Sequence, residues 1–143
     1  MRTSSVLAFL VMVVGLAVLL SRHAILAVRP WTIAVQVAAV LLMLYARITF
    51  GRRSFHAAAN PTAGGIVTSG PYAFVRHPIY AAVLYFTWAA VLDHPSWVSM
   101  GGAVLISAGA IARMLMEERF LVRRYPEYTD YMRRTARVVP YLV

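Results

Sequence analysis

The chain has 143 residues, of which 61% are hydrophobic and 13% charged, and its mean hydropathy is +0.69. Soluble domains are closer to half apolar and a quarter charged, so this composition favours a membrane protein. Cysteine is absent, which excludes disulfides, thiolate nucleophiles and cysteine zinc sites. All fourteen basic residues are arginines that flank apolar runs, and the net charge is +9. This pattern indicates an anionic bilayer surface as partner, and no nucleic acid.

Two apolar segments open the chain. Residues 5–21 carry no charge and come close to the roughly 20 residues that a spanning helix needs. The run exceeds the h-region of a signal peptide, about 7–15 residues, which favours a retained span over a cleaved signal. Residues 30–46 are predicted to form the second span. Pro30 suits the first turn of a helix, and Trp31 is placed like an interfacial anchor.

A less apolar stretch follows, at 47–77. Its breaker signals, such as Gly64-Gly65, predict a loop, and a short interfacial helix is expected near 50–59.

Two further apolar segments, 78–92 and 97–116, are separated by a turn so short that they must form an antiparallel hairpin. Both arms rise about 1.5 Å per residue, so the outgoing helix returns to the level at which the first helix began. Polar residues from the two arms are therefore expected to meet there. They are Arg76, His77, Tyr80, Arg113, Glu117 and Glu118.

The remaining residues, 117–143, are predicted to form an interfacial amphipathic tail. Tyr128, Tyr131 and Met132 share one helical face, and arginines occupy much of the rest. The tyrosine face is expected to point toward lipid and the arginines toward headgroups.

The predicted fold is an all-α integral membrane protein of about four transmembrane helices plus this tail, in a single domain, 1–143. Arginine is concentrated in the N-terminus, the loop and the tail, whereas Arg22 and Arg29 alone lie on the other side. The positive-inside rule therefore predicts that the N-terminus and the polar cluster are cytosolic. The lysine-free, arginine-rich composition favours a bacterial inner membrane.

Arg113 stands out because it lies inside an apolar run. An arginine at the centre of a span costs roughly 2.5–3.5 kcal/mol on insertion scales, so it is a functional candidate by default. The alternative is that it snorkels to the interface, paired with Glu117. These two residues are four apart and share a helix face, whereas Glu118 points about 100° away.

Several familiar chemistries are excluded by their missing motifs. The four histidines are scattered and no H-E-x-x-H occurs, so no metal site is predicted. The chain also lacks G-x-S-x-G, a Walker lysine and G-x-G-x-x-G, so a nucleotide-like cofactor must bind in a non-Rossmann manner.

The second half of the chain resembles the isoprenylcysteine carboxyl methyltransferase family, which is related to the membrane phospholipid methyltransferases. Several short motifs occur in the family's order and spacing. They are Val-Thr-Ser-Gly-Pro-Tyr at 67–72, Val-Arg-His-Pro-Ile-Tyr at 75–80, the glutamate pair at 117–118, Tyr-Pro-Glu-Tyr-Thr-Asp-Tyr at 125–131 and Arg-Val-Val-Pro at 137–140. One departure is Ala82, where the family commonly has glycine.

The resemblance implies S-adenosylmethionine as the methyl donor, bound on the cytosolic side between the hairpin and the tail. It implies Arg113 and Glu117 as catalytic residues. The implied cofactor-binding residues are Tyr72, Arg76, His77, Pro78, Tyr80, Glu117 and Glu118. Tyr72 and Tyr80 are also suited to face a sulfonium through cation–π attraction.

The expected function is therefore methyl transfer to a lipophilic acceptor, by resemblance a carboxylate such as an isoprenylcysteine-type substrate. Methylation of a phospholipid or amine headgroup is an alternative, and so is a non-catalytic membrane scaffold or transport subunit. The expected partners are a lipophilic small molecule or lipid substrate and membrane lipids, with the oligomeric state unassigned.

Overall fold

The computed structural model describes residues 2–51 and 65–140, and within these ranges the chain is helical and contains no strand. The predicted all-α class is confirmed. The elements are α1 (Arg2–Ser21), α2 (Pro30–Phe50), a 3₁₀ turn η2 (Gly70–Ala73), α3 (Pro78–Asp93), α4 (Trp97–Arg124) and α5 (Tyr128–Arg134).

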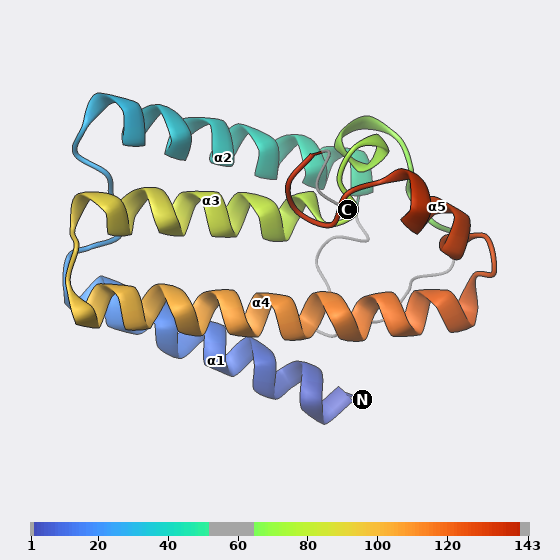
Figure 1. Cartoon of the computed structure of the whole chain (residues 1–143), viewed down its shortest axis with the longest axis horizontal. Helices are drawn as coiled ribbons and strands as arrows, with labels where there is room; N and C mark the ends of the chain where they lie inside the picture. The colour runs from blue at the N-terminus through green and yellow to red at the C-terminus, as the bar shows by residue number, and fades with distance from the viewer. Residues whose placement is uncertain (1, 52–64, 141–143) are drawn as a thin grey trace.

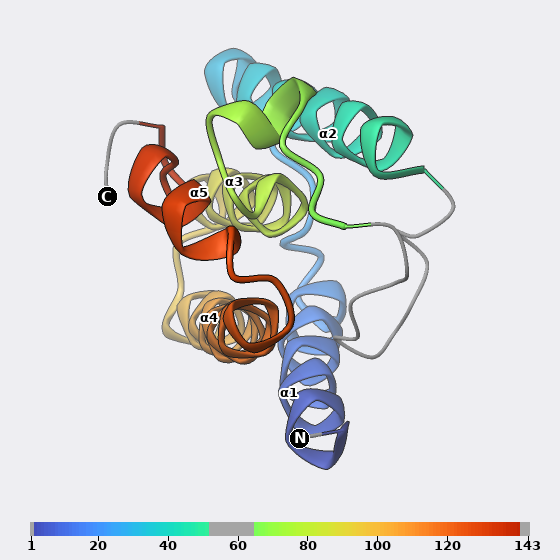
Figure 2. The same ribbon diagram turned by 90° about the vertical axis from the view of Figure 1, so that its right-hand side faces the viewer.

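The four long helices run alternately back and forth along the molecule (Figure 1). Seen end-on, α1 packs against α4, α4 lies beside α3, and α3 packs against α2 (Figure 2). The short helix α5 lies at the end of the molecule where α1 starts and α4 stops. Polar residues from the two ends of the chain are thereby brought to the same end of the bundle.

Among the helices that the structure describes, three are long and apolar enough to cross a membrane, namely α1, α2 and α4. Helix α3 has 16 residues and is about 24 Å long, shorter than a hydrocarbon core of about 30 Å. It lies between α2 and α4 (Figure 2) and buries small residues such as Ala81 and Ala90 completely. The shortest of the four predicted spans is thus shielded by its neighbours.

Glycines allow α1 and α4 to approach closely. A Cβ on Gly15 would lie 2.5 Å from the carbonyl oxygen of Gly102, and one on Gly109 would lie 2.6 Å from that of Ala8. Such small-residue contacts are typical of helices that pack inside membranes. They hold α1 closely against α4 from Ala8 to Gly15.

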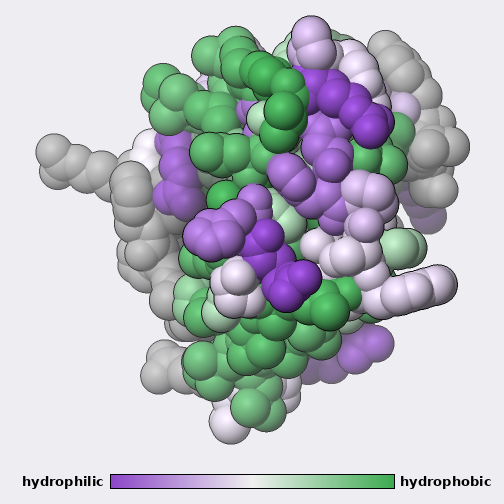
Figure 3. Space-filling model, turned by 90° about the vertical axis from the view of Figure 1, so that its left-hand side faces the viewer, coloured by the Kyte–Doolittle hydropathy of each residue, from purple (hydrophilic) through white to green (hydrophobic). Residues whose placement is uncertain are grey.

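Polar groups also join the α1–α2 link to the α3–α4 turn, at the end of the bundle opposite to α5. The Asp93 carboxylate accepts hydrogen bonds from the backbone N–H of Val28 (2.5 Å), the N–H of Arg29 (2.8 Å) and the Thr32 hydroxyl (2.6 Å). The link between α1 and α2 is therefore tied to the turn between α3 and α4. Figure 3 shows this end, where hydrophilic side chains gather between hydrophobic ones.

Two helix ends differ from the predicted bounds. Helix α4 continues to Arg124 instead of ending at 116, because residues 117–124 contain good helix formers and the first breaker is Pro126. Helix α2 extends through Phe50, into the predicted loop, and ends at Gly51 with φ +67°. The interfacial helix expected near 50–59 lies outside the described residues beyond Gly51.

The tyrosine face of the tail is covered by protein. Tyr128 and Tyr131 are only 3% and 6% exposed, and the Tyr131 hydroxyl donates to the carbonyl oxygen of Tyr72 at 2.6 Å. The expectation that this face points toward lipid is therefore wrong, because the stretch before α3 covers it.

Candidate functional site

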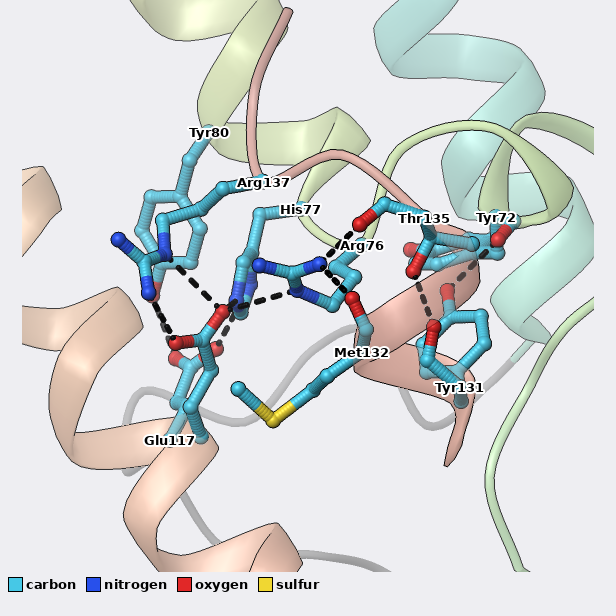
Figure 4. A network of polar contacts seen from close by, with 10 residues as sticks. Tyr72, Arg76, His77, Tyr80, Glu117, Tyr131, Met132, Thr135 and Arg137 are labelled. Atoms are coloured by element: carbon cyan, nitrogen blue, oxygen red, sulfur yellow. Dashed lines mark hydrogen bonds and ion pairs between the residues drawn. The ribbon is translucent and has the colours of Figure 1, made fainter. Parts of the chain in front are cut away.

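The segment that precedes α3 pairs with the C-terminal segment. Val75 and Ala136 form an isolated parallel bridge. The Arg76 N–H donates to the Ala136 carbonyl (2.8 Å), and the His77 N–H donates to that of Arg137 (3.2 Å). This pairing holds the C-terminal segment beside the Arg-His-Pro motif, close to the end of α4 (Figure 4).

The Glu118 carboxylate is the centre of a buried ionic cluster. Its Oε1 accepts from Arg76 Nε at 3.1 Å, and Arg137 reaches Oε1 through Nε at 3.2 Å and Oε2 through Nη2 at 2.8 Å. His77 Nε2 lies 3.2 Å from Oε1. A carboxylate only accepts, so Nε2 carries a proton in this contact. Glu118 is 5% exposed, and charged groups so deeply buried require such partners.

Arg76 extends the cluster to the tail. Its Nη1 donates to the carbonyl oxygens of Met132, at 2.8 Å, and Thr135. These two carbonyls lie at the end of α5 (Figure 4). One guanidinium therefore links α4, α5 and the stretch before α3.

Glu117 belongs to a second chain of contacts. Its Oε1 accepts from the Tyr80 hydroxyl at 2.5 Å, and the same hydroxyl accepts from Arg113 Nε at 2.8 Å. Arg113 Nη2 lies 3.9 Å from Glu117, and His77 Nδ1 lies 3.8 Å from it on the other side. The Glu117 side chain is 24% exposed, compared with 5% for Glu118. The adjacent glutamates thus occupy different environments, and Glu117 is the accessible one.

Arg113 is held inside the protein. Its side chain is 7% exposed, its Nη1 donates to the Ser5 carbonyl at 3.2 Å, and its Cζ lies 5.6 Å from the centre of the Phe9 ring. Helix α1 therefore covers the guanidinium, and the expected pairing with Glu117 is present at 3.9 Å.

The fold brings together six of the residues singled out in the sequence. Pro78 directly follows the cluster and starts α3, and Ala82 is buried one turn later. Tyr72 lies apart, packed against Phe50 with 5.5 Å between ring centroids and joined to the site through Tyr131. The six residues are Arg76, His77, Tyr80, Arg113, Glu117 and Glu118.

Arg137 was not among the predicted site residues. It lies in the Arg-Val-Val-Pro motif, but no local chemical pattern distinguishes it from the other tail arginines. Only the pairing of residues 136–137 with 76–77 places it on Glu118. The hydrogen bonds to Glu118 raise the pKa of Arg137 and keep it charged.

Burial also fixes the tyrosines beside the cluster in the neutral form. Desolvation raises the pKa of Tyr131 to about 12 and raises the pKa values of Tyr72 and Tyr128. These phenols therefore act as hydrogen-bonding and packing groups, not as proton acceptors, near neutral pH.

A comparison with known families decides the classification, because the phospholipid methyltransferase family matches residues 32–128. The chain belongs to the phospholipid methyltransferase family. The match runs from α2 to the first residue of α5. The matched residues thus include Glu117 and Glu118, while α1 and Arg137 lie outside them.

Two curated relatives share about half of the chain. The cobalt-zinc-cadmium resistance protein CzcN of Cupriavidus metallidurans is 34% identical over 82 residues, covering 54% of this chain and 36% of the relative. The nickel-cobalt-cadmium resistance protein NccN of Alcaligenes xylosoxydans xylosoxydans is 36% identical over 80 residues, covering 54% and 37%. The matched part is thus little more than a third of either relative. No solved structure matches.

Proposed function

We propose that this membrane protein transfers a methyl group from S-adenosylmethionine to a lipophilic acceptor, and that the acceptor group is a carboxylate such as that of an isoprenylcysteine-type substrate. The observation that carries the proposal is the continuous network Arg113–Tyr80–Glu117–His77–Glu118. It joins a buried guanidinium to a partly accessible carboxylate at the polar end of the hairpin.

The residues present fit this cofactor. S-adenosylmethionine carries a carboxylate, an ammonium and a ribose diol, and its sulfonium supplies an electrophilic methyl group. Glu117, which is 24% exposed, suits the ammonium or the diol. The basic groups Arg76, His77 and Arg137 suit the carboxylate, and Tyr80 suits the sulfonium. We assign Glu118 the task of holding the three basic side chains in place, since both of its oxygens are bonded to them.

The acceptor needs alignment more than a strong base. Methyl transfer is an in-line displacement, and a carboxylate is already ionised near neutral pH. Its oxygen bonds to the methyl carbon while the electron pair of the sulfur–methyl bond stays on sulfur, and no proton moves. We assign Arg113 the orientation of this carboxylate, because a guanidinium binds carboxylates through its planar fork. Tyr80 and Glu117 hold Arg113 in place.

Methylation of an amine headgroup is the second candidate. The accessible carboxylate of Glu117 favours it, since a carboxylate would hold an ammonium group, and it accords with the family's description. A non-catalytic membrane role is the third candidate function. It is supported by the names of CzcN and NccN, which describe metal resistance proteins.

We place the site on the cytosolic side of a bacterial inner membrane, within a single domain. The support is the distribution of arginine, since the helix ends around the site carry most of these residues. Five of them are exposed on the last turns of α4 and on α5. They are Arg119, Arg123, Arg124, Arg133 and Arg134.

The test is calorimetric titration of S-adenosylhomocysteine into the detergent-purified chain. We expect the wild type to bind and both His77→Ala and Glu118→Ala to lose at least about tenfold in affinity, since each removes a charged hydrogen bond. Glu127→Gln is the matched control because Glu127 is exposed, and it should bind like the wild type. A folded wild type that does not bind would refute the proposed function.

A further inference from the structure

Helix α1 forms part of the site although it lies outside the family-matched residues, 32–128. The Ser5 carbonyl accepts from Arg113 Nη1 at 3.2 Å. One turn later, the Phe9 ring lies 5.6 Å from the centre of the same guanidinium, within reach of a cation–π contact. Ser5 and Phe9 are therefore both within reach of any group that Arg113 binds.

Ser5 has a hydroxyl whose hydrogen bonding is incomplete. The residue is 3% exposed, and within the described part of the chain its Oγ is buried without a hydrogen-bond partner. A buried hydroxyl left in this state costs roughly 1–3 kcal/mol, so such groups in native proteins call for an explanation. The carbonyl of the same residue accepts from Arg113, so Ser5 borders the guanidinium.

Phe9 lies between the Ser5–Arg113 contact and the outer surface of α1. Its side chain is 42% exposed although it contacts a buried cation. The residues next to it on the exterior, Leu10 and Val13, are 49% and 42% exposed. An apolar chain attached to a head group at Arg113 can therefore continue along α1 without crossing a polar surface.

We propose that Ser5 and Phe9 form the acceptor subsite and determine acceptor specificity. The Ser5 hydroxyl donates to an oxyanionic head group beside Arg113, and the Phe9 ring packs against the first part of the acceptor's apolar chain. This inference rests on the proposed function. It adds acceptor contacts from a helix that the family match does not include.

The experiment uses the full chain in detergent with a methyl-labelled donor and two acceptor probes, the acidic and the amine-containing lipid fractions of bacterial membranes. In Ser5→Ala, the concentration of acidic fraction at half-maximal rate should rise about tenfold or more, with the maximal rate within about threefold. Ser5→Thr keeps a hydroxyl and should restore the wild-type value. Phe9→Ala should show the same rise as Ser5→Ala.

The controls are Ser4→Ala and Leu7→Ala, since Ser4 is exposed next to Ser5 and Leu7, which is 58% exposed, lies on the side of α1 away from Ser5 and Phe9. Both should behave like the wild type. S-adenosylhomocysteine binding, measured by calorimetry, should be unchanged in every variant. This separates acceptor binding from the cofactor site.

Each other outcome has a defined meaning. Wild-type half-saturation in Ser5→Ala and Phe9→Ala would overturn the acceptor subsite and leave the proposed function intact. Lost S-adenosylhomocysteine binding in these variants would show a structural role and would also overturn it. Labelling of the amine fraction alone would overturn the oxyanionic assignment. A wild type that binds no S-adenosylhomocysteine, or methylates neither fraction, would overturn the proposed function and this inference together.

Discussion

Arg113 is a buried cation with contacts on three elements. Its Nε donates to Tyr80 on α3, its Nη1 donates to Ser5 on α1, and Glu117 lies one turn further along α4. The cost of placing an arginine at this depth is offset by these fixed partners. A group held in this way has little freedom to move, which suits it for orienting a substrate.

Arg113→Lys tests whether the planar guanidinium matters. Lysine keeps the positive charge but lacks the fork that reaches Tyr80 and Ser5 at once. We expect methyl transfer to fall at least about tenfold, while S-adenosylhomocysteine binding changes less than about twofold. Arg119→Lys is the control because Arg119 is exposed on the same helix. Full turnover by Arg113→Lys would contradict the orienting role.

Most residues of the polar network at the candidate site could be predicted from the sequence, but the sequence does not show which of them are buried and which are accessible. Adjacent positions on a helix point about 100° apart, so the sequence predicts that the two glutamates point in different directions. Only the fold shows that Glu118 is covered by three basic groups and that Glu117 stays accessible. Arg137 could not be found, because its place depends on a backbone bridge between distant segments.

The close contact of α1 with α4 is the main interaction at the scale of elements. At Gly109, a Cβ would lie 2.5 Å from Met12 Cγ and 2.6 Å from the Ala8 carbonyl oxygen, whereas at Gly101 it would meet nothing within 4 Å. These two glycines lie on the same helix and differ in whether α1 covers them. They therefore provide a matched pair of substitution sites.

Gly109→Val should push α1 away from α4, because backbone atoms cannot yield to a side chain at that distance. We expect a lower thermal midpoint, followed by circular dichroism in detergent, and weaker methyl transfer as Ser5 withdraws from Arg113. Gly101→Val should match the wild type in both measurements. Equal midpoints for the two variants would show that the glycine contact does not hold α1 in place.

Element types were predictable from hydropathy and element ends were less so. The apolar runs marked all four long helices, but the end of α4 depends on good helix formers that continue past the apolar residues to Arg124. The pairing of α1 with α4 was not predicted. Apolar spans carry little information about their neighbours, since lipid tails are as apolar as the side chains.

The molecule as a whole is tied together at both ends by polar groups, and only one end carries the candidate site. At the other end, the Asp93 side chain is 1% exposed and joins the link between α1 and α2 to the α3–α4 turn through Val28, Arg29 and Thr32. This contact holds the pair α1–α4 against the pair α2–α3. Its effect on stability should therefore be separable from binding at the site.

Asp93→Asn removes the negative charge from a side chain whose Oδ2 accepts three hydrogen bonds and whose Oδ1 lies 3.6 Å from Arg29 Nε, and hydrogen bonds to a charged acceptor are about twice as strong as neutral ones. We expect a lower thermal midpoint of unfolding, with S-adenosylhomocysteine affinity unchanged. Asp130→Asn is the control because the Asp130 side chain is 70% exposed. Reduced affinity without a lower midpoint would show that the two ends are coupled.

The unequal lengths of the hairpin arms, 28 residues in α4 and 16 in α3, have a consequence for insertions and deletions. Each added residue in one arm would turn the polar end by about 100° and shift it by about 1.5 Å against the other arm. His77 would then no longer face Glu118. Length changes within the arms should therefore be tolerated only when they restore the register of both helices.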